Sequence, residues 1–219
     1  MISLIVSLGL IFGLLIVAEY LWRTDRLEAE TSRKIIHIGV GTFIAFWPVY
    51  MSWTQIQLLS GLLFIGILMS YQLGVFGAIH KIKQQSSGEL WYPIGIGLAA
   101  VFTSQPWIFT IAILHLALAD GFASIIGYRF GLRHYRIGQH TKSLIGSFAF
   151  FITSAGLCLL AYLVLLPELP GTSLAVFALT PFLATAVESI SRNGIDNVLI
   201  PLTVVFAFGL PTGMLVLNI

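Results

Sequence analysis

Apolar stretches close to the length that crosses a lipid bilayer follow one another along nearly the whole of this 219-residue sequence. Hydrophobic residues make up 58% of the chain and charged residues only 9%, against roughly 25% charged in ordinary soluble domains. A soluble domain of this size buries only about 70–75% of the surface of its unfolded chain, so a water-soluble fold would expose large apolar patches. The sequence therefore predicts an all-α, polytopic integral membrane protein.

Candidate membrane spans follow from the rule that about 20 apolar residues cross the hydrocarbon. We expect about eight transmembrane helices, near residues 2–22, 35–50, 55–76, 91–104, 107–127, 144–166, 173–190 and 197–217. The second and fourth are short, but removing the fourth would move the basic loop 128–143 to the opposite side of the membrane, against the bias of Lys and Arg toward the cytoplasm.

The basic residues predict the orientation of these spans. The cytoplasmic loops would be 23–34, 77–90, 128–143 and 191–196. They hold every Lys and Arg of the chain: Arg23, Arg26, Arg33, Lys34, Lys81, Lys83, Arg129, Arg133, Arg136, Lys142 and Arg192. We therefore expect both termini on the non-cytoplasmic side and any active site on the cytoplasmic side, because the opposite loops are too short to hold one.

The chain has no long linker and no low-complexity tract, so we expect a single transmembrane domain over residues 1–219. No basic stripe accompanies a soluble fold, which argues against a nucleic-acid partner. The expected partners are the surrounding membrane lipids, and the sequence leaves open whether the protein forms a homo-oligomer.

The strongest candidate site residue is Asp120, an acid within the fifth expected span. It precedes Tyr128 by eight residues, which places it roughly 12 Å inside the helix end. An isolated carboxylate there costs about 2.5–3.5 kcal/mol on insertion scales, so a partner is required. Asp120, Ser124, Gly127 and Gly131 share one helical stripe, where a ligand or another backbone can approach the acid. The alternative is a helix-packing seam with a satisfied acid.

Other charged candidates flank the second and fourth spans. Arg33, Lys34 and His37 crowd one end of one helical face, as a polyphosphate grip would require. The alternative for Arg33 and Lys34 is that they only extend to the membrane interface. Glu89 is either a site ligand or a solvated loop acid.

Polar residues in the last two cytoplasmic loops complete the set of candidates. Arg129, Lys142 and Ser143 belong to a basic loop that could wrap a nucleoside triphosphate, although the Lys-Ser pair lacks the spacing of a P-loop. Attraction to lipid headgroups is the alternative for this loop. Glu188 could pair with Arg192 four residues on. The oxygen donors Asp196 and Asn197 suit Mg²⁺.

In their order along the chain, these motifs resemble the CTP-dependent polyprenol kinases, a family that groups dolichol kinase, phytol kinase and the fungal-type diacylglycerol kinase. The matching pieces are Arg33-Lys34 with His37, Glu89 before Tyr92-Pro93, Asp120 through Gly127 and Gly131, Lys142-Ser143 with Gly146, and Glu188 through Asn197 with Pro201. The third and fourth pieces also resemble the signature of membrane CDP-diacylglycerol synthases. Ile145 stands where family members often carry an acid, which leaves one metal ligand or base unaccounted for.

The resemblance implies transfer of the terminal phosphate of CTP, with Mg²⁺ as cofactor, to a lipid alcohol: a polyprenol, phytol, a shorter prenol or diacylglycerol. The implied catalytic residues are Asp120, Lys142, Arg33 and Lys34. The implied nucleotide-binding residues are Arg33, Lys34, Ser124, Gly127, Arg129, Gly131, Lys142 and Ser143. The implied metal ligands are Asp120, Glu188 and Asp196, with His37, Glu89 and Asn197 as further candidates.

Two other functions remain open from the sequence. A phosphatidate cytidylyltransferase would use similar residues but leave CMP on the lipid. A non-enzymatic membrane transporter would use Asp120 as an ion or proton relay, but the outer halves of the spans carry few polar groups to continue such a path.

Overall fold

The computed structural model describes residues 2–26, 29–73, 88–138, 140–165 and 174–218, so the expected basic residues Lys81 and Lys83 lie outside the described part of the chain. The helices are α1 (Ile2–Arg23), α2 (Ala29–Ala45), α3 (Trp53–Leu73), α5 (Gly88–Phe102), α6 (Pro106–Leu114), α7 (Asp120–Phe130), α8 (Leu144–Leu165), α9 (Leu174–Ile190) and α10 (Asp196–Thr212). A π-helical turn, His115–Ala119, joins α6 to α7 without a break. Two short strands, β1 (His134–Ile137) and β2 (His140–Ser143), precede α8.

Within the described residues, four helical segments are long and apolar enough to cross a membrane: Ile2–Arg23, Trp53–Leu73, Pro106–Phe130 and Leu144–Val164. The shorter helices α5, α9 and α10 are also apolar. Each expected span thus corresponds to a helical segment. The observed ends differ from the expected ends most clearly at α2 and α10. α2 starts before residue 35 and stops at Ala45, after which the chain turns through the 3-10 helix Trp47–Val49. α10 stops at Thr212 because Gly213 adopts the left-handed conformation, with φ 66°.

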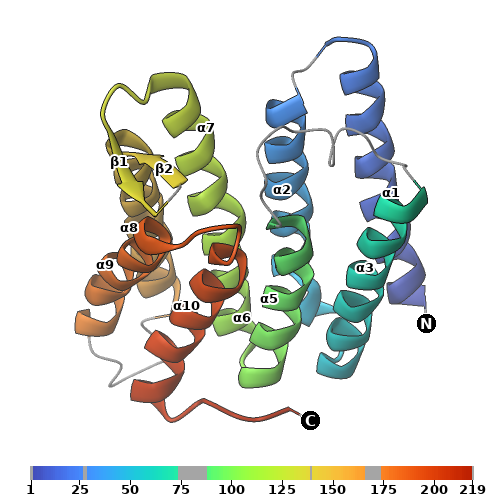
Figure 1. The fold of residues 1–219 in the computed structure, drawn as a ribbon. Helices are drawn as coiled ribbons and strands as arrows, with labels where there is room; N and C mark the ends of the chain where they lie inside the picture. The colour runs from blue at the N-terminus through green and yellow to red at the C-terminus, as the bar shows by residue number, and fades with distance from the viewer. Residues whose placement is uncertain (1, 27–28, 74–87, 139, 166–173, 219) are drawn as a thin grey trace.

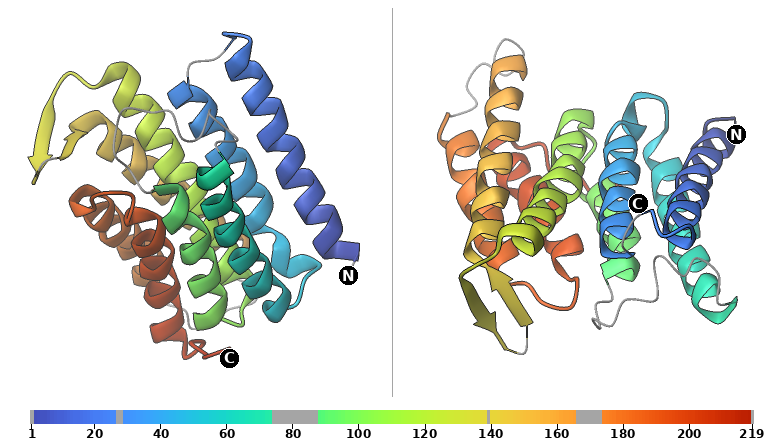
Figure 2. Two further views of the ribbon diagram at one scale, coloured as in Figure 1. Left: turned by 45° about the vertical axis from the view of Figure 1, so that its right-hand side comes forward. Right: turned by 90° about the horizontal axis from the view of Figure 1, so that it is seen from above.

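The helices form one side-by-side bundle, with α1 at its edge (Figure 1). α6 and the π-helical turn run through its middle, against α2, α8 and α10. On one side α3 packs on α5, and on the other α7, α8 and α9 follow in order, with α10 between α9 and α5 (Figure 2). The largest fully buried side chains are Trp47, Phe109, Phe150 and Phe208. α6 is therefore a core helix, and its packing positions the π-helical turn and the start of α7.

The expectation of an all-α chain missed a β-hairpin between α7 and α8. β1 and β2 pair antiparallel, from His134 opposite Ser143 to Ile137 opposite His140. Gly138 turns the chain with φ 61°, a conformation that favours glycine in tight hairpin turns. We call the end of the bundle that carries this hairpin the hairpin end; α2 and α10 begin there, and α7 and α9 end there (Figure 1).

Gly95 lets α5 approach the start of α10. A Cβ atom at Gly95 would lie 2.0 Å from the backbone oxygen of Asn197, and backbone atoms cannot move aside as a side-chain end can. Gly61 on α3 is the matched control, because a Cβ atom there would meet nothing within 4 Å.

We predict that Gly95→Ala destabilises the protein by about 1–3 kcal/mol, the usual cost of overpacking. Gly61→Ala should be neutral or slightly stabilising, since Ala has the higher helix propensity. Thermal unfolding of both variants in the same detergent measures the difference. Equal apparent Tm values for the two variants would contradict the close approach of α5 and α10.

Candidate active site

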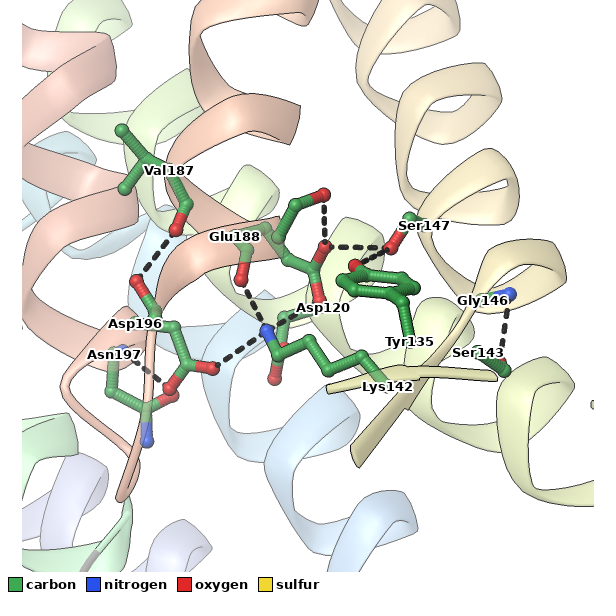
Figure 3. A network of polar contacts seen from close by, with 12 residues as sticks. Asp120, Tyr135, Lys142, Ser143, Gly146, Ser147, Val187, Glu188, Asp196 and Asn197 are labelled. Atoms are coloured by element: carbon green, nitrogen blue, oxygen red, sulfur yellow. Dashed lines mark hydrogen bonds and ion pairs between the residues drawn. The ribbon is translucent and has the colours of Figure 1, made fainter. Parts of the chain in front are cut away.

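Charged side chains from five elements converge at the hairpin end of the bundle. α2 contributes Lys34, α7 contributes Asp120, β2 contributes Lys142, α9 contributes Glu188 and α10 contributes Asp196. Asp120, Glu188 and Asp196 point toward the ammonium group of Lys142 (Figure 3). We call these five residues the acid–lysine cluster.

Lys142 is the central cation of the acid–lysine cluster. Its Nζ atom lies 2.6 Å from Oε1 of Glu188 and 3.5 Å from Oδ2 of Asp196, and it also donates to the backbone oxygen of Glu188. Ser147 donates to the other carboxylate oxygen of Glu188, at 3.2 Å, and Tyr135 shares a 2.6 Å hydrogen bond with Ser147. The hairpin and the start of α8 thus fix the position of the Glu188 carboxylate.

Glu188 could have paired with Arg192, but the structure places it on Lys142. Arg192 instead lies against the hairpin turn at Gly138. Glu188 therefore belongs to the acid–lysine cluster, whereas Arg192 follows the end of α9.

Asp120 has the cationic partner that its depth requires. Its Oδ2 atom lies 3.8 Å from Nζ of Lys34 and 3.4 Å from Nε2 of His37, and all three side chains are largely buried. α2 therefore supplies the positive charge that makes a carboxylate tolerable at the start of α7.

The charge state of Lys142 is set by opposing effects. Burial alone would lower the pKa of Lys142, but the carboxylates of Glu188 and Asp196 outweigh burial and raise it above the ordinary value. Asp120 acts in the same direction from further away. The ammonium of Lys142 is therefore charged throughout the physiological range of pH.

The side-chain oxygen atoms of this site are of the kind that bind Mg²⁺. Asp120, Glu188 and Asp196 offer carboxylate oxygens, the ligands that Mg²⁺ prefers, and the buried Oδ1 atom of Asn197 has no hydrogen-bond partner. In the described residues, however, no three His, Cys, Asp or Glu side chains are arranged as a metal site. Lys142 stands between the acids instead, so holding a divalent ion here requires a shift of that side chain.

Several expected nucleotide-binding residues have structural contacts in the described chain. Ser143 caps α8, because the backbone N–H of Gly146 donates to its Oγ atom at 3.1 Å. A Cβ atom at Gly127 or Gly131 would collide with Ser143, so these glycines let α7 pack on the start of α8. Nucleotide binding by these residues and by Ser124 stays a prediction.

Three further candidate site residues lie outside the acid–lysine cluster. Arg129 is exposed in the last turn of α7. Glu89 accepts a hydrogen bond from Tyr71 of α3. Asn197 donates from Nδ2 to the backbone oxygen of Gly88, at 2.7 Å, and so joins α10 to the start of α5. The acid–lysine cluster contains none of these three.

Two aromatic residues beside the site were not among the predicted site residues. Tyr135 reaches Glu188 through Ser147. Tyr92 donates to the backbone oxygen of His37 at 3.1 Å, and its ring centroid lies 4.6 Å from that of His37. The place of Tyr92 beside Pro93 in the matched motif was the available signal, whereas nothing marked Tyr135.

The fold and the acid–lysine cluster together define a helical membrane protein with a buried, charged site at one end. The chain is 32% identical over 199 residues to a phytol kinase of Synechocystis sp., a match that covers 87% of this chain and 83% of the relative. It is 28% identical to phytol kinase 1, chloroplastic, of Arabidopsis thaliana, covering 94% of this chain and 74% of that protein. The chain belongs to the phytol kinase family.

A further relative is the farnesol kinase, chloroplastic, of Arabidopsis thaliana, with 29% identity over 80% of this chain and 64% of that protein. No family model matches the chain. No solved structure matches it either.

We predict that Lys142→Met destabilises the protein by about 3–5 kcal/mol, because the buried carboxylates of Glu188 and Asp196 lose their cation. Adding Glu188→Gln to this variant should recover part of the loss. Arg136→Met, an exposed position in the same hairpin, is the control and should change little. Thermal unfolding in detergent measures all three, and a Lys142→Met variant as stable as the control would contradict the ion pairs.

The raised pKa of Lys142 predicts a pH window for this stabilisation. The contribution is complete below the ordinary pKa of lysine, about 10.4, and is lost only as the pH rises through the higher pKa of the folded state. We expect the difference in apparent Tm between the native protein and Lys142→Met to stay constant from pH 7 to about pH 10. A difference that disappears below about pH 9 would contradict the raised pKa.

Proposed function

We propose that the protein is a CTP-dependent kinase that phosphorylates a membrane prenol such as phytol or farnesol. The relatives named phytol kinase and farnesol kinase support the choice of acceptor. The observation that carries the proposal is the acid–lysine cluster, in which the buried Lys34, the largely buried Lys142 and three carboxylates meet at one end of an apolar bundle. Phosphoryl transfer needs mainly positioning and charge neutralisation, which such a cluster offers.

The role of the lysines is to neutralise the phosphates of the nucleotide. Lys34 and Lys142 bind phosphate oxygens of the nucleotide, and Arg33 adds positive charge from the start of α2. Each ammonium group is held by a carboxylate in the described structure, so nucleotide binding exchanges a carboxylate partner for a phosphate. These cations stabilise the charge that develops on the transferred phosphoryl group.

The role of the carboxylates is to bind metal and to accept a proton. Mg²⁺, when bound with the nucleotide by Asp196, Glu188 or Asp120, would neutralise phosphate charge. We assign to Asp120 the acceptance of the proton from the acceptor hydroxyl. Its position at the start of α7, far from the end of that helix at the hairpin end, supports this role. An alcohol held at the bilayer interface by its chain reaches such an acid from the membrane side.

The same proposal includes the topology. The chain acts as a single catalytic domain, with eight helices crossing the membrane, both termini on the non-cytoplasmic side and the hairpin end at the cytoplasmic face. The support is the placement of the basic residues, since Lys34, Lys142 and Arg192 all lie at the hairpin end. The cytoplasm is also where a nucleotide is available.

The function is tested by incubating purified protein with phytol or farnesol and with CTP labelled in either the γ or the α phosphate. We expect label on the lipid from the γ phosphate only. Label from the α phosphate would identify a cytidylyltransferase and would contradict the proposal, as would absence of transfer from either position. The same assay with ATP tests the choice of nucleotide.

We predict that Asp120→Asn lowers kcat by at least about 100-fold while the protein remains folded, because the amide can neither accept a proton nor hold Mg²⁺ as a carboxylate does. Asp25→Asn makes the same chemical change in an exposed turn with φ 53°, which Asn tolerates, and should be fully active. Initial rates with γ-labelled CTP measure the effect. Full activity of Asp120→Asn would remove Asp120 from the mechanism.

A further inference from the structure

The π-helical turn before Asp120 creates a need for an outside hydrogen-bond donor. The backbone N–H of Asp120 bonds to the carbonyl of His115, five residues back, where an α-helix bonds four residues back. When such a helix returns to α-helical spacing, one carbonyl is passed over and has no donor within the helix. Since this segment is buried, that carbonyl needs a partner from elsewhere.

His37 of α2 is a partner of this kind. Its Nε2 atom lies 2.8 Å from the backbone oxygen of Leu116, within the π-helical turn, and 3.4 Å from Oδ2 of Asp120. A carbonyl oxygen only accepts hydrogen bonds, so Nε2 carries the hydrogen and Nδ1 does not in the neutral ring. One N–H group of His37 thus faces both the backbone of the turn and the carboxylate that comes after it.

The ring of His37 is itself held in place. Tyr92 donates to the His37 backbone oxygen and contacts its ring. Gly121 faces α2, where a Cβ atom would lie 2.4 Å from a side-chain carbon of Ile38. α2 therefore packs closely on α7 beside His37.

We propose that His37 is a positioning residue that fixes the π-helical turn and the Asp120 carboxylate with one N–H group, leaving the other oxygen of Asp120 for the acceptor alcohol. The inference rests on the proposed function, because it assigns a role in the same reaction. It differs from the sequence-based interpretation of His37 as part of a polyphosphate grip. Contact with the backbone of the turn favours positioning over phosphate binding.

The test compares His37→Gln with His37→Asn, two variants with the same amide group. The Gln amide nitrogen extends about as far as Nε2, whereas the Asn nitrogen extends only to the place of Nδ1. We expect His37→Gln to keep kcat within about 10-fold of the native protein and His37→Asn to lose about 100-fold, the effect of a small misplacement of a reacting group. KM for CTP should be unchanged in both variants.

Hydrogen exchange in the segment Leu116–Gly121 is measured on the same proteins and does not depend on activity. We expect faster exchange in His37→Asn than in His37→Gln, because only the Asn variant leaves the Leu116 carbonyl without a donor. Equal exchange in the two variants would overturn the proposal.

The kinetic outcomes are also decisive. Equal kcat values for the two variants would mean that the position of the N–H group is irrelevant, and a rise in KM for CTP with kcat unchanged would place His37 in a phosphate grip. Either result overturns the positioning role. A native protein without kinase activity would instead refute the proposed function, and hydrogen exchange would still decide whether His37 holds the turn.

Discussion

Burial of charge is the constraint on which this structure depends. A carboxylate or an ammonium group within an apolar bundle is tolerable only when an opposite charge lies beside it. Asp120 has Lys34, while Glu188 and Asp196 share Lys142. Because these partners come from separate helices and a hairpin, the packing of the whole hairpin end has to satisfy them together.

The same arrangement has consequences for chemistry. Two lysines held near three acids are already oriented and partly dehydrated, so little reorganisation is required when a polyphosphate replaces a carboxylate as partner. The β-hairpin is important for this arrangement, because it positions Lys142 among the carboxylates while its turn lies against Arg192. The buried helix α6 and the π-helical turn position Asp120 at the opposite side of the cluster.

The sequence predicted the helices and the need for a partner of Asp120, because apolar length and the cost of a buried acid are both local properties of the chain. It did not predict which cation pairs with which acid, since Lys34 and Asp120 lie far apart in the sequence and only the packing of α2 on α7 brings them together. The hairpin was missed because its basic residues were interpreted as a loop, although Gly138 was a turn signal. The π-helical turn had no sequence signal, as its residues are ordinary helix formers. No sequence signal indicated that Ser143 caps α8, and its predicted contact with the nucleotide stays a prediction.

The central claim is that the acid–lysine cluster is where the nucleotide binds. A structure of the protein in lipid nanodiscs with Mg²⁺ and a non-hydrolysable CTP analogue tests this claim most directly. Triphosphate density in contact with Lys34 and Lys142, with the Lys142 ammonium moved away from Glu188, is the predicted result. Triphosphate density away from the hairpin end, or at that end with Lys142 still bound between Glu188 and Asp196, would contradict it.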